Sequence, residues 1–176
     1  WDLFKYPGIR SDSDMHTMGF RFKPWTDAKT IADGPSILEY LNEAADENNL
    51  REKIQFETKV KTAQWDSSSA TWRLGIDKGE QGQLQDVTCK ILYLCGGYYN
   101  YDQGYLPEFK GYDEFEGQLI HPQQWPEDLN YENKKVIVIG SGATAVTIVP
   151  AMADKVSKIT MLQRSPTYYM AAPDQR

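Results

Sequence analysis

The chain has 176 residues, 40% of them hydrophobic and 12% aromatic, with a net charge of −6. This length predicts one domain, or one domain and a piece of another. No stretch approaches the roughly 18 apolar residues of a membrane-spanning helix and no leader peptide is recognisable, so a cytoplasmic location is expected. The sequence holds two cysteines, two dispersed histidines and no basic stripe interleaved with aromatics, which argues against disulfides, a metal centre and nucleic-acid binding.

Charge is unevenly distributed along the chain. Residues 1–100 carry 12 basic and 15 acidic side chains, residues 101–132 carry 1 and 8, and residues 133–176 carry 6 and 2. The basic final part suits a phosphate ligand, and the acidic middle part is expected to be a solvated connector. Because the chain starts at Trp1 without Met and stops soon after its last predicted strand, we expect an internal segment of a longer protein.

Residues 1–25 show no regular spacing of apolar residues and are rich in aromatic, Pro, Gly and Asp residues. This composition predicts an ordered loop with a turn at Pro7-Gly8. Taken alone, such a loop could be a surface loop held by its own aromatic side chains. A helix follows, capped by Asp33, with Pro35 in its first turn, and it is predicted to run to about Leu50. Its expected core stripe is Ile37, Leu38, Leu41, Ala44 and Ala45, and its expected solvated face is Glu39, Glu43, Asp46 and Glu47.

Between residues 54 and 97 the apolar period becomes two, which predicts a short antiparallel meander. The last member grows more apolar and stops at Gly96-Gly97, as if a strand enters a buried sheet there; the glycines either admit a ligand or make a bend. Cys89 and Cys95 would lie about 20 Å apart on that strand, at about 3.3 Å per residue, and are not expected to pair. The strands are expected at 54–56, 60–65, 71–76 and 87–95.

Residues 98–131 hold several Pro and Gly residues and are predicted to form a linker with fixed turns. The next stretch, 134–165, is expected to organise the fold. Four β-formers at 136–139 predict a strand buried on both faces of a parallel sheet, and a helix-spaced apolar pattern follows the turn after them.

The turn between this strand and helix reads G-x-G-x-x-A. Gly140 allows the sharp bend, Gly142 lets a pyrophosphate approach bare backbone, and Ala145 lets the helix pack closely on the strand. The pattern predicts a dinucleotide site, and a structural glycine turn in another α/β protein is the alternative. The residues expected to form the site are Gly140, Ser141, Gly142, Ala143, Thr144, Ala145 and Val146.

A second strand, 158–162, ends at Gln163, where an NAD site usually places Asp or Glu. Arg164 follows, and its guanidinium can hold a 2′-phosphate through two hydrogen bonds, while Ser165 can add a hydroxyl donor. The strand end therefore favours NADPH.

The linker contains the pattern F-x-G-x-x-x-H-x-x-x-W-P, formed by Phe115, Gly117, His121, Trp125 and Pro126. This pattern resembles the fingerprint of Baeyer–Villiger monooxygenases. The resemblance continues in WDLF, YPG, RSDSD, ADG, YYNYD and QRSPTY, which are similar to the subgroup containing the ethionamide-activating monooxygenase. His121 by itself is more typical of a structural hydrogen-bonding histidine than of a catalyst.

The resemblance implies an α/β flavoprotein with two dinucleotide-binding domains. Residues 1–100 would be part of the FAD-binding domain with its β-meander, 101–132 the inter-domain linker, and 133–176 the first βαβ unit of the NADPH-binding domain. It also implies that Asp12 is an active-site aspartate near the flavin. The cofactor contacts implied by the resemblance are Trp1, Asp2 and Leu3 at the end of the first FAD-binding segment, Arg10 and Ser11 near the nicotinamide nucleotide, and Val60 at the FAD adenine.

The implied reaction uses NADPH, FAD and O₂ to insert oxygen into a ketone through a C4a-peroxyflavin. A ketone or thioether is the expected small-molecule substrate. Two alternatives stay open: a related N- or S-oxygenating flavin monooxygenase, and an isolated segment without activity of its own. Cys95-Gly96-Gly97 departs from the family's usual Cys-Ser-Gly or Ala-Thr-Gly. The FAD pyrophosphate loop and the arginine partner of Asp12 would lie outside this segment.

Overall fold

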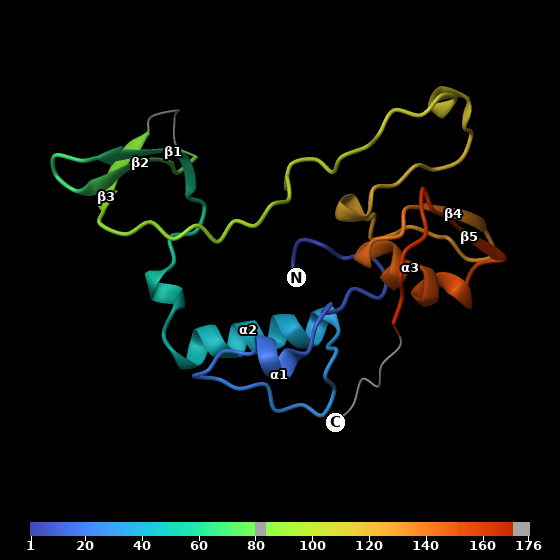
Figure 1. Cartoon of the computed structure of the whole chain (residues 1–176), viewed down its shortest axis with the longest axis horizontal. Helices are drawn as coiled ribbons and strands as arrows, with labels where there is room; N and C mark the ends of the chain where they lie inside the picture. The colour runs from blue at the N-terminus through green and yellow to red at the C-terminus, as the bar shows by residue number, and fades with distance from the viewer. Residues whose placement is uncertain (80–83, 171–176) are drawn as a thin grey trace. The chain divides into compact units, whose positions relative to one another are not determined.

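The computed structural model describes residues 1–79 and 84–170 (Figure 1). Its backbone divides into two compact units. The first joins Trp1–Ala44 to Asn100–Arg176, and the second is Ala45–Tyr99. The N-terminal loop and helix therefore belong to the same unit as the linker and the glycine-rich turn, although the second unit separates them in the sequence.

A small core in the first unit surrounds helix α2 (Gly34–Glu47). As predicted, residues 1–25 form an ordered loop, which only the short helix α1 (Met15–Met18) and isolated bridges interrupt. Tyr40 Oη accepts a hydrogen bond from Phe20 N and donates one to Lys23 O, both at 2.6 Å, so α2 holds the loop. The buried core residues are Met15, Trp25, Ala32, Ile37 and Tyr40, with Leu41 packed against them.

Both ends of α2 have a local cause. Asp33 caps it as predicted, because Asp33 Oδ1 accepts hydrogen bonds from Ser36 N at 3.0 Å and Ser36 Oγ at 2.8 Å. The helix ends at Glu47 rather than near Leu50. Asn49 adopts φ +50°, and Leu50 N donates to Ala45 O at 2.8 Å, which closes the C-terminus.

The predicted faces of α2 are largely correct. Ile37 and Ala44 are buried, and the other members of the predicted stripe, Leu38, Leu41 and Ala45, are half-buried. Tyr40, which was not part of the predicted stripe, is buried as well. The predicted solvated face, Glu39, Glu43, Asp46 and Glu47, is exposed.

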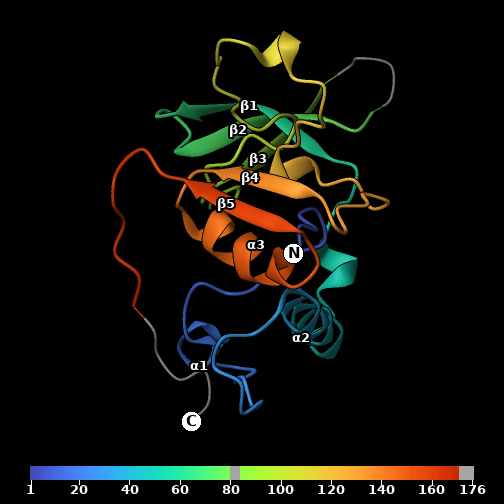
Figure 2. The same cartoon turned by 90° about the vertical axis from the view of Figure 1, so that its right-hand side faces the viewer.

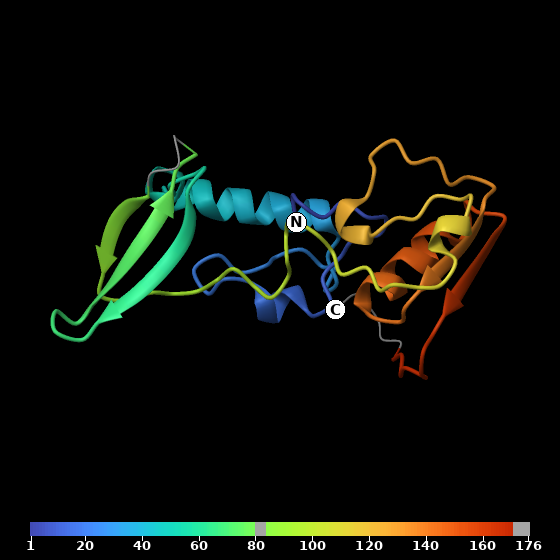
Figure 3. The same cartoon turned by 90° about the horizontal axis from the view of Figure 1, so that it is seen from above.

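The second unit contains the predicted meander, formed by β1 (Lys59–Asp66), β2 (Thr71–Asp77) and β3 (Gln85–Cys89) in antiparallel order β1-β2-β3 (Figure 3). The β1–β2 turn is stabilised by Asp66, whose two carboxylate oxygens accept hydrogen bonds from Ser68 Oγ and Ser69 Oγ, each at 2.7 Å. Trp65 and Trp72 are paired across the two strands, and their rings pack at a tilt of 58° with centroids 5.5 Å apart.

Two predictions for this region are wrong. Residues 54–56 form no strand, because a 3-10 turn, Arg51–Lys53, precedes them and a turn follows. The last strand ends at Cys89 instead of Cys95. Ile91 and Leu94 are 83% and 84% exposed, so the apolar run has no covering layer in the described chain and its β-propensity alone does not make a strand. Cys89 and Cys95 are both free thiols, and only Cys89 lies in a strand.

In the first unit, β4 (Lys135–Ile139), α3 (Ala143–Ala153) and β5 (Lys158–Leu162) form the predicted strand–helix–strand module. The strands are parallel, in register from Lys135 beside Lys158 to Ile139 beside Leu162. Helix α3 lies along one face of the pair (Figure 2). Ala145, Ile148 and Met152 are buried on its inner side. This is a strand–helix–strand unit with parallel strands.

The expectation that β4 is buried on both faces is wrong for the described residues. Val136 and Val138 face α3 and are half-buried, whereas Ile137 and Ile139 are 67% and 55% exposed. One helix can cover only one face of a sheet, and successive side chains of a strand point to opposite faces. None of the helices in the described ranges has the length and apolar character needed to cross a bilayer.

Candidate functional site

The glycine loop, residues 140–145, joins β4 to α3. Gly140 adopts φ +124°, a conformation that residues with a Cβ rarely adopt, and its N–H donates to Leu162 O at 2.9 Å. The parallel ladder thus continues one step past β4 before the chain turns. Gly142 is the N-cap of α3 with φ −77°, and it has no side-chain capping hydrogen bond.

The loop leaves open space where a phosphate would lie. A Cβ built on Gly140 or Gly142 would meet no described atom within 4 Å. Ala145, by contrast, is buried and packs α3 onto the strands. Unfilled space, an N-cap without a side-chain capping bond and a close-packed third position together fit the pyrophosphate of a dinucleotide.

The segment after β5 returns to this loop. Ser141 Oγ and Thr167 Oγ1 are 2.8 Å apart, and Gln163 Nε2 donates to Tyr169 Oη at 2.8 Å. Arg164 and Ser165 lie between these contacts and are exposed. The sequence pattern did not identify Thr167 as a site residue, because only its contact with Ser141 places it beside the loop.

The N-terminal segment packs on α3. The Tyr6 phenol lies beside the Thr144 side chain in the first turn of α3. Gly8 has φ +74°, and a Cβ there would lie 2.8 Å from Ala151 Cβ and 3.0 Å from Thr147 O. The turn predicted at Pro7-Gly8 is therefore seated directly on the helix, in a place where only glycine fits.

The residues matched to the flavin and nicotinamide sites follow this turn. The backbone of Arg10 forms an isolated antiparallel β-bridge with that of Asp33. Ser11 is only 3% exposed, and Ser11 Oγ accepts a hydrogen bond from Ala32 N at 3.1 Å. The Ser11 hydroxyl therefore holds the loop against the start of α2. Asp12 is exposed and close enough to Tyr6 for its charge to raise the pKa of that phenol, although burial is the larger cause.

The residues predicted to contact FAD are divided between the two units. Trp1, Asp2 and Leu3 are exposed at the start of the first unit. Val60 is 51% exposed on β1, in the second unit, beside a bulge between Val60 and Thr62.

The residues of the F-x-G-x-x-x-H-x-x-x-W-P pattern have local structural roles. The Phe115 ring folds over Gly117 and the His121 ring lies against the buried Gly104, so a Cβ on either glycine would collide with a ring. His121 Nδ1 accepts a hydrogen bond from Gln123 N at 3.3 Å, and Gln123 Nε2 donates to Asn100 O at 2.9 Å. These contacts fix the turn at 121–124 against the start of the linker and give His121 a structural part.

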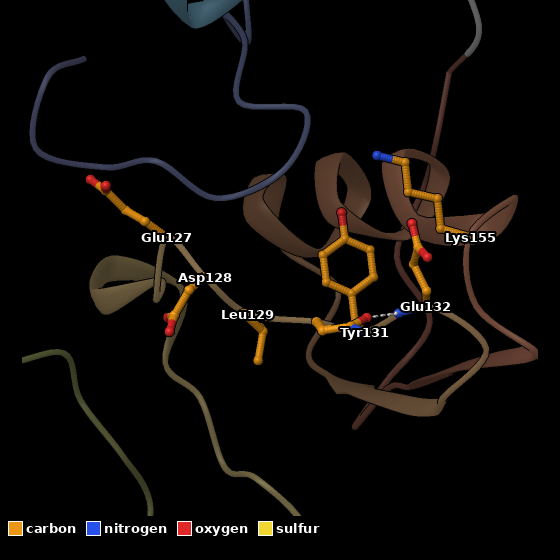
Figure 4. A pocket seen from close by; sticks show the side chains of 7 residues that line it. Glu127, Asp128, Leu129, Tyr131, Glu132 and Lys155 are labelled. Atoms are coloured by element: carbon orange, nitrogen blue, oxygen red, sulfur yellow. Dashed lines mark hydrogen bonds between the residues drawn. The ribbon is translucent and has the colours of Figure 1, made fainter.

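The end of the pattern contacts the far end of α3. The Trp125 ring stands edge-on to the Tyr131 ring at 6.1 Å, and Lys155 Nζ lies 6.0 Å from the Tyr131 centroid. A polar pocket of about 400 Å³ lies there, at the opposite end of α3 from the glycine loop (Figure 4). It is lined by Glu127, Asp128, Leu129, Asn130, Tyr131, Glu132 and Lys155. Among the described residues, no group of His, Cys, Asp and Glu is arranged to hold a metal ion.

Curated proteins are similar to this chain in sequence. The FAD-containing monooxygenase EthA of Mycolicibacterium smegmatis is 57% identical over 174 residues, covering 98% of this chain and 35% of that protein. EthA of Mycobacterium tuberculosis is 55% identical over 176 residues, covering 99% of this chain and 36% of that protein. The chain thus spans about a third of the length of these curated relatives.

Solved structures of monooxygenases are also similar to this chain. An oxidised steroid monooxygenase bound to NADP matches with a TM-score of 0.78 and 30% identity, over 96% of this chain and 32% of that one. A cyclohexanone-bound cyclohexanone monooxygenase matches with a TM-score of 0.76 and 30% identity, over the same shares.

The family model described as Flavin-binding monooxygenase-like matches residues 21–174. This match, together with the relatives, confirms the resemblance found in the sequence. The chain belongs to the flavin-binding monooxygenase-like family.

Proposed function

We propose that this chain is part of an enzyme that uses FAD, NADPH and O₂ to insert an oxygen atom into a ketone, forming an ester or lactone. The observation that carries the proposal is the open glycine loop at the N-terminus of α3, followed by Arg164 at the end of β5. Relatives named FAD-containing monooxygenases and neighbours solved with NADP or cyclohexanone support it.

In this proposal the glycine loop binds the nicotinamide dinucleotide. The free amides of the first turn of α3 hold the pyrophosphate, and the adjacent backbone carries no side chain that competes for that space. Arg164 holds the 2′-phosphate and Ser165 adds a hydroxyl donor. FAD and NADPH, when bound, would supply the activation of O₂ and the hydride.

The division of the chain is part of the same proposal. Residues 1–100 contribute to the FAD-binding domain, with Trp1, Asp2, Leu3 and Val60 among the FAD contacts. Residues 101–132 link the domains, and residues 133–176 begin the NADPH-binding domain. Arg10 and Ser11 would lie near the nicotinamide. Ser11 N already donates to Ala32 O at 2.8 Å, whereas the Ser11 hydroxyl accepts from Ala32 N and keeps its own hydrogen to donate.

Asp12 would lie near the flavin and orient an arginine that lies outside this segment. Its segment is held by the backbone β-bridge between Arg10 and Asp33 and by the seat of Gly8 on α3, so the exposed carboxylate projects from a fixed backbone. In the full-length enzyme, Asp12→Ala is expected to retain FAD, seen as its flavin absorbance, while ketone oxygenation falls by about 10²-fold. Asp27→Ala, on an exposed part of the same loop, is the matched control.

The substrate class is tested with the same enzyme. Supplied with NADPH and O₂, it should convert a cyclic ketone to a lactone, detected by mass spectrometry. Oxygenation of amines or thioethers alone would replace the ketone proposal with an N- or S-oxygenating activity. Unchanged ketone turnover in Asp12→Ala would remove Asp12 from the mechanism.

A further inference from the structure

The segment after β5, residues 163–169, forms a closed loop. At its base, Gln163 Nε2 donates hydrogen bonds to Tyr169 Oη at 2.8 Å and to Met161 Sδ at 3.4 Å, and Tyr169 Oη lies 3.5 Å from the same sulfur. The two ends of the segment are therefore fastened to each other and to the end of β5. Pro166, inside the loop, has a fixed φ, which further reduces the conformations open to this segment.

A hydrogen bond joins this closed loop to the glycine loop. Ser141 Oγ and Thr167 Oγ1 are 2.8 Å apart, and either hydroxyl can donate. Both residues are exposed, so water can replace either partner and the bond adds little to the stability of the whole fold. Its main effect is local, because it sets the distance between the middle of the closed loop and the turn before α3.

Arg164 lies within the closed loop, one residue after Gln163 and three before Thr167. In the proposed function, Arg164 holds the 2′-phosphate while the glycine loop holds the pyrophosphate. These two groups belong to one ligand, so the closed loop and the glycine loop must stand at a matching separation. A loop that is already held at that separation loses less conformational entropy when the ligand binds.

We propose that Thr167 is a positioning residue for cofactor discrimination. Its hydrogen bond to Ser141 holds the closed loop against the glycine loop, so that Arg164 meets the 2′-phosphate of a dinucleotide whose pyrophosphate lies at the N-terminus of α3. This role rests on the proposed NADPH site. Because Thr167 acts through Arg164, it contributes to the binding of NADP⁺ and not to that of NAD⁺, which has no 2′-phosphate.

Equilibrium titration of the full-length, FAD-loaded protein with NADP⁺ and with NAD⁺ tests the proposal without turnover. Thr167→Val keeps the shape of the side chain and removes its hydroxyl. It should raise the dissociation constant of NADP⁺ by about three- to tenfold and leave that of NAD⁺ unchanged. Thr167→Ser keeps the hydroxyl and should restore the affinity for NADP⁺. Adding Thr167→Val to Arg164→Ala should cause no further change, because the arginine through which Thr167 acts is already gone.

Thr71→Val is the matched control. Thr71 Oγ1 lies 2.7 Å from Ser69 Oγ, an exposed hydroxyl pair of the same kind at the start of β2 in the second unit, so both dissociation constants should stay at their wild-type values. Three results would overturn the role of Thr167 alone: NADP⁺ binding in Thr167→Val that is unchanged or tighter, an equal loss for NAD⁺, or a loss that persists in Arg164→Ala. Wild-type protein that binds NADP⁺ no better than NAD⁺ would overturn the proposed NADPH site as well.

Discussion

At the scale of single residues, Gly140 and Gly142 exclude a side chain for different reasons. Gly140 has φ +124°, so a Cβ would strain the backbone even though the surrounding space is open. Gly142 has φ −77°, which any residue adopts, and the space around it is open too. Glycine at 142 therefore has no explanation within the described chain, and the approach of a ligand supplies one.

This difference gives a test of the loop. Gly142→Ala should leave the melting temperature unchanged and weaken NADP⁺ binding at least about tenfold, since the new methyl group would occupy the phosphate position. Gly140→Ala should instead lower the free energy of unfolding by about 1–2 kcal/mol. Thermal unfolding and calorimetric titration of the full-length variants measure both. Gly142→Ala with wild-type affinity would show that no phosphate lies against this glycine.

Arg164 provides the second residue-scale prediction. A charge-assisted hydrogen bond contributes about 1.5–3 kcal/mol, so Arg164→Ala should raise the KM for NADPH by about ten- to a hundredfold and change the KM for NADH little. Steady-state kinetics with the two cofactors separate these effects. Arg164→Lys keeps the charge without the bidentate geometry and should fall between them. Equal changes for both cofactors would show that Arg164 does not contact the 2′-phosphate.

At the scale of elements, local hydrogen bonds and turns set where helices and strands end. Asp33 and Asn49 bound α2, and Asp66 with its two serine partners forms the turn between β1 and β2. Asp66 hydrogen bonds chiefly to Ser68 and then to Ser69, and these bonds lower the pKa of its carboxyl to about 2. The charged carboxylate is the form that accepts all of these hydrogen bonds.

The β1–β2 turn should therefore weaken in acid. Because the folded-state pKa of Asp66 is lowered, its contribution to stability is complete above the ordinary value of 3.8 and is lost as the pH falls toward about 2. An NMR titration of the Asp66 carboxyl carbon should give a midpoint near 2, and Ser68→Ala should move the midpoint toward 3.8. A midpoint near 3.8 in the unmodified chain would contradict these hydrogen bonds.

At the scale of the whole molecule, both units expose apolar surface. Ile137 and Ile139 lie on the uncovered face of β4, and Ile91 and Leu94 lie on the extended stretch after β3. Monomeric proteins rarely leave such side chains exposed in continuous runs, and unpaired strand edges favour association. The chain covers about a third of its curated relatives, and their further residues could cover these surfaces.

We therefore expect a polypeptide of only these 176 residues to be unstable by itself. Far-UV circular dichroism should show secondary structure, while the near-UV spectrum should be weak and thermal unfolding should lack a cooperative transition. Purified from cells, it should carry no yellow flavin. A cooperative melt with bound flavin would show that these surfaces need no further cover.

The sequence by itself determined the elements that depend on neighbouring residues. Helix spacing and the Asp33 cap predicted α2, the alternating period predicted β1 and β2, and the order of strand, glycine loop and helix predicted β4, α3 and β5. In each case the signal lies within a few residues of the structure it specifies, as a cap, a turn or an apolar period. The same local signals failed at 54–56 and 90–95, where a strand needs a partner that the spacing cannot reveal.

Only the tertiary structure decided which distant residues meet. It placed Tyr6 beside Thr144, Gly8 on α3, Lys5 beside Glu127 and the His121 ring on Gly104. It also left one face of β4 open, although the apolar run had predicted burial on both sides. The physical reason is that contact and burial depend on how separate segments pack, whereas propensity and period report only the conformation of each segment.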